Sequence, residues 1–214
     1  STLLASSAAS DVYKRQRLMN AVQKELRLDR QPRHIECFDN SNLQGAHPVA
    51  SCVVFRDGKP SRKEYRHFNI KTVTGADDYA SMREVVFRRY TRLMAEGAEM
   101  PDLIIADGGK GQMGVIHEVL ERLGLDIPIA GLAKDDRHRT AELLCGFPPV
   151  LVGIRPTSPL FHFLAHIQEE VHRFAVSFHR QKRSKAFIHS ELEQIEGVGD
   201  KTVQTLLRHF RTVE

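Results

Sequence analysis

The sequence contains no tryptophan and only three cysteines among its 214 residues. Cys37, Cys52 and Cys145 are widely spaced and form no CxxC pair, so the sequence predicts neither a zinc site nor a disulfide framework. Because reduced thiols are typical of the cytoplasm, we expect a cytoplasmic protein. No apolar run approaches the roughly 18 residues of a membrane span, so we also expect no membrane contact.

The charge balance is mildly basic, since 31 lysines and arginines stand against 27 acidic residues and give a formal net charge of +4. With 41% hydrophobic residues, the chain can form one sizeable core and a small appendage. A basic balance fits a polyanionic partner, although many proteins that bind no nucleic acid are equally basic. A local cluster is more specific, and its side chains either contact DNA or form a solvated helix face: Arg173, Arg180, Lys182, Arg183 and Lys185.

The first sixteen residues differ from the rest of the chain. Residues 11–16 read DVYKRQ, which resembles the translated end of a sequencing transposon, so residues 1–16 are left out of the fold prediction. We expect the native protein to continue further upstream. At the other end, the chain stops within what resembles an unfinished motif, so a piece of a longer protein is expected.

Hydrophobic periodicity predicts an alternating order of strands and helices. Three early strands with short connections predict an antiparallel meander, and a later strand-helix-strand unit predicts parallel pairing. This order is typical of the ribonuclease H-like α/β fold, a mixed sheet flanked by helices. The expected strands are 33–40, 48–56, 63–71, 102–106 and 127–133, the expected helices are 17–28, 77–96, 112–123 and 160–187, and residues 134–159 are expected to be irregular with a possible hairpin about 147–149.

The last segment has a different pattern, in which two glycines separate two short helices. Gly197 and Gly199, followed by Lys201, have the spacing of a helix-hairpin-helix turn, which presents backbone N–H groups to a DNA phosphate. An ordinary helical hairpin with a glycine stop is the alternative. We therefore expect a nuclease-like domain over residues 17–187 and a truncated DNA-binding segment over residues 188–214.

Two aspartates follow apolar runs at the expected ends of strands. Asp39 follows residues 34–38, and Asp107 follows residues 103–106. The two strands should be neighbours, and ligands of α/β sheets gather at the carboxyl ends of strands. Convergent carboxylates repel each other, and a bound Mg²⁺ or Mn²⁺ relieves that repulsion. We predict that Asp39 and Asp107 hold a divalent metal; turn or capping roles are the alternative.

Two further residues are candidates for catalysis. His172 lies beside the apolar face of the last long helix, and an imidazole that meets the two aspartates can orient water or transfer a proton. A packed or capping histidine is the alternative. Asp78 is a weaker candidate, because either it or Asp77 is expected to be a helix N-cap. The basic residues of the same helix either contact phosphates or are solvated: Arg83, Arg88 and Arg89.

A glycine-rich loop follows Asp107 and reads Gly-Gly-Lys-Gly over residues 108–111. It lacks the GxxxxGK[ST] spacing, since Gln112 stands where Ser or Thr is needed, so we predict neither nucleotide binding nor a small-molecule substrate. The glycines instead let a DNA backbone approach the next helix N-terminus, with Lys110 contacting a phosphate.

These residues resemble a known family. Residues 33–214 are similar to the C-terminal half of UvrC proteins, the nuclease subunits of the bacterial UvrABC excision-repair system. The matching blocks occur in the same order along the chain: 36–39 (ECFD), 41–42 (SN), 48–51 (PVAS), 64–66 (EYR), 77–82 (DDYASM), 107–112 (DGGKGQ), 172–175 (HRFA) and 179–180 (HR).

The resemblance implies a ribonuclease H-like endonuclease followed by helix-hairpin-helix motifs. It implies Asp39, Asp107 and His172 as the catalytic triad and Asp78 as a further acidic position. The implied activity is metal-dependent incision of damaged double-stranded DNA on the 5′ side of the lesion. UvrB, and UvrA indirectly, are the implied partners, although the UvrB-binding segment and the domain for the 3′ incision are expected outside this chain.

The sequence departs from the family at one point near the site. The family usually has Ile-Arg-Asp-Glu before the histidine, whereas residues 167–170 here are Ile-Gln-Glu-Glu. Without that arginine, weaker phosphate binding is expected, with Gln168 in its place. The rival hypothesis is a non-catalytic DNA-binding module, which would bind DNA in the presence of EDTA and would not cut it, whichever metal is added.

Overall fold

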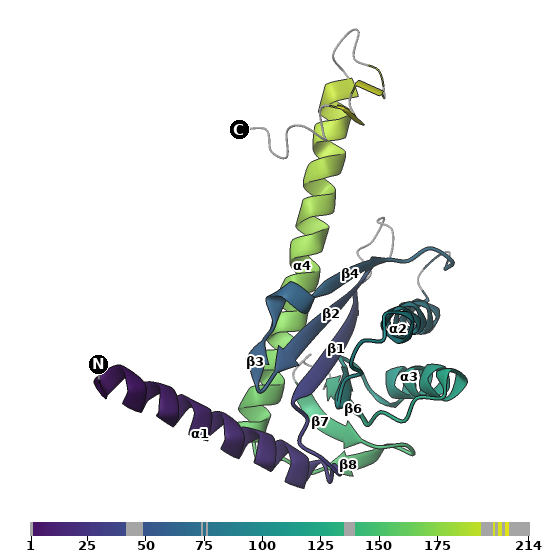
Figure 1. Cartoon of the computed structure of the whole chain (residues 1–214). Coiled ribbons are helices and arrows are strands. Elements are labelled where there is room, and N and C mark those ends of the chain that lie inside the picture. The colour runs from purple at the N-terminus through teal and green to yellow at the C-terminus, as the bar shows by residue number, and fades with distance from the viewer. Residues whose placement is uncertain are drawn as a thin grey trace. The chain divides into compact units, whose positions relative to one another are not determined.

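Within the described residues, eight strands form one mixed sheet at the centre of a unit that spans residues 1–175 (Figure 1). The structure is a computed structural model, and it describes residues 2–41, 49–73, 75, 77–134, 140–193, 199, 201–202 and 204–205. The order of strands across the sheet is β3-β2-β1-β5-β6-β7-β8, and β4 also pairs with β2. Residues 176–214 form a second unit.

The early strands form the predicted antiparallel meander. β1 (His34–Ser41) pairs with β2 (Val49–Arg56), which pairs with both β3 (Lys59–Pro60) and β4 (Arg66–Asn69). The strand predicted over 63–71 is shorter than expected, because its first residues form the 3₁₀ turn η1 (Arg62–Glu64).

The parallel part of the sheet also matches the prediction. β5 (Leu103–Ala106) runs parallel to β1, and β6 (Ile129–Lys134) runs parallel to β5. The helix α3 (Lys110–Leu123) is the crossover between β5 and β6. Every residue of β5 is buried, as expected of a central strand that is covered on both faces.

The prediction of an irregular segment over residues 134–159 was wrong in part. β7 (Thr140–Cys145) and β8 (Val150–Val152) extend the sheet as an antiparallel hairpin, whose turn includes the expected Phe147. β8 consists of three apolar residues, of which Val150 and Leu151 are exposed, so its sequence lacks the alternation of polar and apolar residues that identifies a strand. Pairing with an existing sheet edge, rather than local periodicity, makes these residues strands.

Helices cover both faces of the sheet (Figure 1). On one face, α2 (Asp78–Ala95) brings Arg89 and Tyr90 to Glu36 of β1. On the other face, the first turns of α4 (Pro159–Glu193) bring Phe163 against Phe55 of β2, with ring centroids 5.8 Å apart. Since neighbouring residues of a strand point to opposite faces, every strand residue can be assigned to the α2 face or the α4 face.

The first helix, α1 (Thr2–Glu25), is longer than the predicted helix over 17–28. Its apolar side contacts the core, since Met19, Val22 and Leu26 are buried and Leu18 is partly buried. Residues 9–17 contribute no buried side chain. Whether residues 1–16 are foreign stays a prediction.

The second unit contains the end of α4, which extends beyond the predicted limit at residue 187 to Glu193. Near the predicted hairpin turn, the backbone N–H of Thr202 donates to the Gly199 carbonyl at 2.8 Å. Gly197 lies outside the described residues. Among the residues that the structure describes, no helix is long and apolar enough to cross a membrane.

Candidate active site

Asp39 and Asp107 lie at the same level on neighbouring parallel strands. Phe38 is in register with Ala106, and the backbone N–H of Asp107 donates to the Phe38 carbonyl at 2.9 Å. Residues in register on parallel strands point to the same face of the sheet, so both aspartates face α4. The tertiary structure therefore brings together two carboxylates that are far apart in sequence.

One turn of α4 meets both aspartates. The imidazole Nδ1 of His172 lies 3.9 Å from the Oδ2 atom of Asp39. The side-chain Nε2 of Gln168 donates a hydrogen bond of 2.5 Å to the Oδ1 atom of Asp107. Gln168 and His172 are four residues apart, so they share one face of the helix. The sequence analysis placed Gln168 near the site, at the position of the family's arginine, but assigned it no contact with Asp107.

The site has one buried side and one open side. The side chain of Asp39 is only 10% exposed, whereas that of His172 is 67% exposed. A nearly buried carboxylate favours a cationic partner, because few water molecules can solvate its charge. The exposed imidazole, in contrast, can meet a large substrate from solvent. This arrangement suits chemistry on a polymer that lies across the ends of β1 and β5.

A serine that the sequence prediction did not consider lies beside Asp39. Ser51 of β2 is directly opposite Asp39 in the antiparallel register, and its side chain is fully buried. Its hydroxyl has no hydrogen-bond partner in the structure. Buried polar groups are rarely left unpaired, so this hydroxyl indicates a ligand or water in the working site. The sequence contained one sign of this residue, because Ser51 is a polar residue on the side of the strand that is otherwise formed by Val53 and Phe55.

These residues fit a hard divalent cation such as Mg²⁺ or Mn²⁺. Asp39 and Asp107 supply carboxylate oxygens, and the unpartnered Ser51 hydroxyl beside Asp39 can hydrogen-bond a coordinated water. Within the described part of the chain, three or more His, Cys, Asp or Glu side chains nowhere gather into a ready-made metal site. Mg²⁺ is commonly held by one or two carboxylates, with water and substrate phosphates as the other ligands.

Asp78 is placed differently from the other candidates. The N-cap of α2 is Asp77, whose carboxylate accepts from the backbone N–H of Ala80 at 2.9 Å, and Asp78 is the first helical residue. The backbone carbonyl of Asp78 accepts a 2.7 Å hydrogen bond from the side chain of Asn40. Asn40 follows Asp39 and points to the opposite face of the sheet. Asp78 is thus linked to the site through its backbone, and a catalytic role for its carboxylate stays a prediction.

The glycine loop has a packing function that is clear from its surroundings. A Cβ atom on Gly111 would lie 2.3 Å from the hydroxyl of Tyr79, and one on Gly131 would lie 2.8 Å from the carbonyl oxygen of Gly108. Glycine at these positions lets β6, the loop and the start of α2 approach closely. Lys110 is exposed at the first position of α3, where it stays a predicted phosphate contact.

Among the predicted DNA-binding residues, Arg173 has an intramolecular partner. Its Nε atom donates to Glu170 at 2.9 Å, and the hydroxyl of Tyr65 donates to the same carboxylate at 3.0 Å. The Arg173 guanidinium, followed by the Tyr65 hydroxyl, lowers the pKa of Glu170 to about 2. The Arg173 side chain is 57% exposed and accessible from solvent, so its contact with DNA stays a prediction.

The other predicted DNA-binding residues belong to the second unit. Arg180 is exposed there, and Lys201 begins a short helical segment after Gly199. The side chains of Lys182 and Arg183 lie outside the described part of the structure, as does Gly197. Their roles stay predictions.

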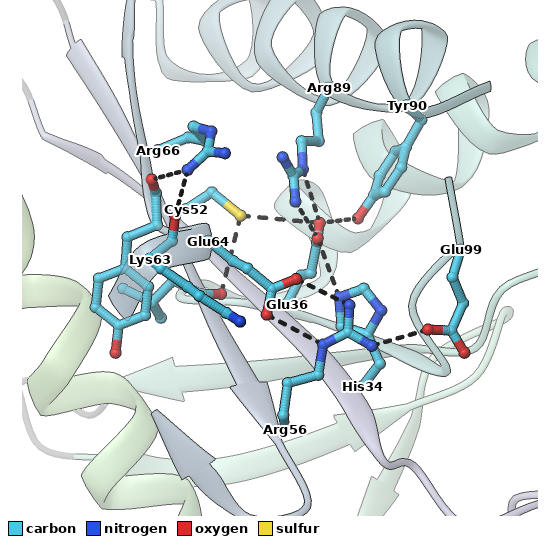
Figure 2. Close-up of polar contacts among 12 residues, drawn as sticks. His34, Glu36, Cys52, Arg56, Lys63, Glu64, Arg66, Arg89, Tyr90 and Glu99 are labelled. Atoms are coloured by element: carbon cyan, nitrogen blue, oxygen red, sulfur yellow. Dashed lines mark hydrogen bonds and ion pairs between the residues drawn. The ribbon is translucent and has the colours of Figure 1, made fainter. Parts of the chain in front are cut away.

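A buried ionic network on the α2 face was not predicted (Figure 2). Glu36 is fully buried, with Arg89 Nη2 2.5 Å and the Tyr90 hydroxyl 3.0 Å from its carboxylate oxygens. Burial raises the pKa of Glu36, but hydrogen bonds from His34 and Arg89 outweigh this effect and leave the pKa below its usual value. Arg89 is 9% exposed, so the hypothesis that it contacts phosphate or is solvated was wrong. Burial also raises the pKa of the Cys52 thiol, which keeps this thiol protonated.

Comparison with known proteins identifies relatives that match most of the chain. Residues 23–176 match the model of the UvrC RNAse H endonuclease domain. The UvrABC system protein C of Bacteroides fragilis is 61% identical over 198 residues, which cover 92% of this chain and 33% of the relative. That of Streptococcus uberis is 56% identical over 204 residues, which cover 95% and 34%. The chain thus spans about a third of the length of these relatives.

Solved structures with a similar arrangement are far more distant. An endonuclease V of Ciona intestinalis, in complex with a 23mer DNA that contains an inosine followed by a ribo-adenosine, is 14% identical, with a TM-score of 0.37 over 63% of each chain.

Proposed function

This chain belongs to the UvrC family and carries its RNase H endonuclease domain, and we propose that it makes the 5′ incision on the damaged strand in nucleotide excision repair. The observation that carries this proposal is the meeting of Asp39 and Asp107 at neighbouring strand ends, below the face of α4 that bears Gln168 and His172. Hydrolysis of a phosphodiester needs an activated water and stabilisation of negative charge. The site has residues suited to both.

The proposed mechanism assigns a role to each residue of the triad. Asp39 and Asp107 hold a divalent cation, Mg²⁺ or Mn²⁺, which when bound supplies a Lewis acid that activates water and offsets charge on the scissile phosphate. His172 orients the attacking water or accepts its proton at the exposed imidazole.

The proposed substrate is damaged double-stranded DNA. Its backbone is held by basic side chains and by the predicted glycine turn, through neutralisation of phosphate charge and backbone N–H donors. These residues are Lys110, Arg173, Arg180, Lys182 and Arg183, together with Gly197, Gly199 and Lys201. UvrB is the proposed protein partner, with UvrA acting through it, and the proposed place of work is the cytoplasm.

The test is an incision assay on a lesion-bearing duplex that is already nicked on the 3′ side of the lesion. The chain is incubated with this DNA, UvrA, UvrB and ATP, in the presence of Mn²⁺ or EDTA. Asp107→Ala is compared with Asp126→Ala, because Asp126 is an exposed aspartate in the loop after α3. The expected result is a 5′ cut that requires Mn²⁺, is lost in Asp107→Ala and is retained in Asp126→Ala.

Two results would contradict the proposal. A cut that persists in EDTA would exclude the metal mechanism, and one that persists in Asp107→Ala would exclude the assigned site. If the chain binds the duplex equally well in EDTA and never cuts it, even when a UvrB-binding segment is fused to it, a non-catalytic DNA-binding module is the better description.

A further inference from the structure

Gln168 lies where α4 meets the end of β5. Its Nε2 atom donates to Oδ1 of Asp107 at 2.5 Å, which is short for a hydrogen bond between an amide and a carboxylate. The residues of α4 that precede and follow it, Leu164, Ile167 and Val171, are at most 1% exposed. The core therefore fixes the turn that presents Gln168.

We propose that Gln168 is a positioning residue, which holds the Asp107 carboxylate in the orientation that a divalent cation requires. This inference rests on the proposed function, because it concerns the same metal site. The terminal torsion of an aspartate is broad, so an unrestrained carboxylate samples many orientations. A donor on Oδ1 restricts that torsion before the cation binds, which lowers the entropic cost of binding.

The amide differs from the arginine that the family usually has at this position. A guanidinium would bring a positive charge beside Asp107 together with its N–H donors. The Gln168 amide supplies an N–H donor without that charge, so its contact positions the carboxylate by hydrogen bonding.

The same helical turn also positions the histidine. Gln168 and His172 are separated by four residues, and each faces one of the two aspartates. A rigid helix therefore sets the spacing between the Asp107 carboxylate and the imidazole, which loops could not do as precisely. Loss of the Gln168 contact is expected to affect the orientation of Asp107 and to leave His172 in place.

The experiment is calorimetric titration of the whole chain with MnCl₂. Gln168→Met removes the donor at nearly constant side-chain volume, and Glu169→Met introduces the same residue at the neighbouring exposed position. Asp107→Asn defines the heat that belongs to the site. We expect Gln168→Met to bind Mn²⁺ about 10-fold more weakly, the typical cost of losing an outer-shell partner, with Glu169→Met unchanged. Gln168→Ala, measured in parallel with thermal melting, gives a second variant if Gln168→Met is poorly folded.

The possible outcomes separate the two proposals. If wild-type chain shows Asp107-dependent Mn²⁺ binding and both Gln168 variants match it, the positioning role is wrong while the metal site stands. If the wild-type chain shows no Asp107-dependent binding, the metal site is wrong, and the role of Gln168 is overturned with it. In the incision assay, the positioning role predicts a lower kcat in Gln168→Met with an unchanged KM for DNA.

Discussion

Ser51 lies directly opposite Asp39 across the antiparallel pair of β1 and β2, fully buried and with no hydrogen-bond partner for its hydroxyl. An unpaired buried hydroxyl costs roughly 1–3 kcal/mol of desolvation. A cost of this kind, next to the carboxylate that we propose as a metal ligand, is expected where a site is complete only with its ligand. The pairing of Ser51 with Asp39 therefore links the stability of the sheet to the proposed site at the ends of its strands.

The first prediction concerns this serine. Ser51→Ala should leave the free energy of unfolding unchanged or raise it by up to about 1 kcal/mol, because it removes an unsatisfied polar group. The same change should weaken Mn²⁺ binding by up to about 10-fold, because a coordinated water loses a partner. Chemical denaturation and calorimetry measure the two effects. Ser81→Ala is the control, since Ser81 of α2 is also buried and unpartnered, and it should leave Mn²⁺ binding unaltered.

The second prediction concerns the buried pair of Glu36 and Arg89. Arg89→Met should lower the free energy of unfolding by about 3–5 kcal/mol, because the Glu36 carboxylate would remain buried without its cation. The double variant Glu36→Leu/Arg89→Met should recover most of the loss, since it removes both charges. Urea denaturation of the four proteins in this cycle measures the coupling. Additive effects of the two substitutions would contradict the network seen in Figure 2.

The third prediction is a pH dependence that originates at Glu170. Arg173 and Tyr65 lower the pKa of its carboxylate from the ordinary 4.5 to about 2 in the folded protein. The ionised form therefore stabilises the fold fully above about pH 4.5, and this contribution is lost as the pH falls towards 2. In urea titrations across this range, Glu170→Gln should reduce the pH-dependent loss by roughly 1–2 kcal/mol, a value discounted because the arginine is largely exposed. Glu169→Gln, at an exposed position, should keep the wild-type profile.

The fourth prediction tests the close packing under the glycine loop. Gly131→Ala should destabilise the protein by about 1–3 kcal/mol, because the new methyl group would meet the backbone oxygen of Gly108, which has little freedom to move. Gly114→Ala is the matched control within α3, where the added methyl group meets nothing within 4 Å. It should stabilise the protein by about 0.5–1 kcal/mol through helix propensity. Equal melting temperatures for the two variants would contradict this account of the loop.

The elements with strong periodicity were predictable from the sequence, and the others were not. Val49, Val53 and Phe55 mark β2, and the buried stripe of α2 is equally regular, so both matched the prediction. The turn of the β7–β8 hairpin was expected but its strands were not delimited, because they become strands by pairing with the edge at β6. Arg89 was misjudged for a related reason, since a charged residue on a helix is ordinarily solvated and only its partner Glu36 allows it to be buried.

The sequence by itself determined the order of the strongly periodic elements, the two aspartates that end apolar strands, and the family to which the chain belongs. Only the tertiary structure decided which side chains meet at those strand ends. Parallel pairing of β1 and β5 sets Asp39 beside Asp107, and the path of α4 brings Gln168 and His172 to them. Periodicity reports which face of an element is buried, because burial depends on local spacing. Contacts between residues 39, 107 and 168 depend on strand register and helix placement, which arise from packing of the whole core.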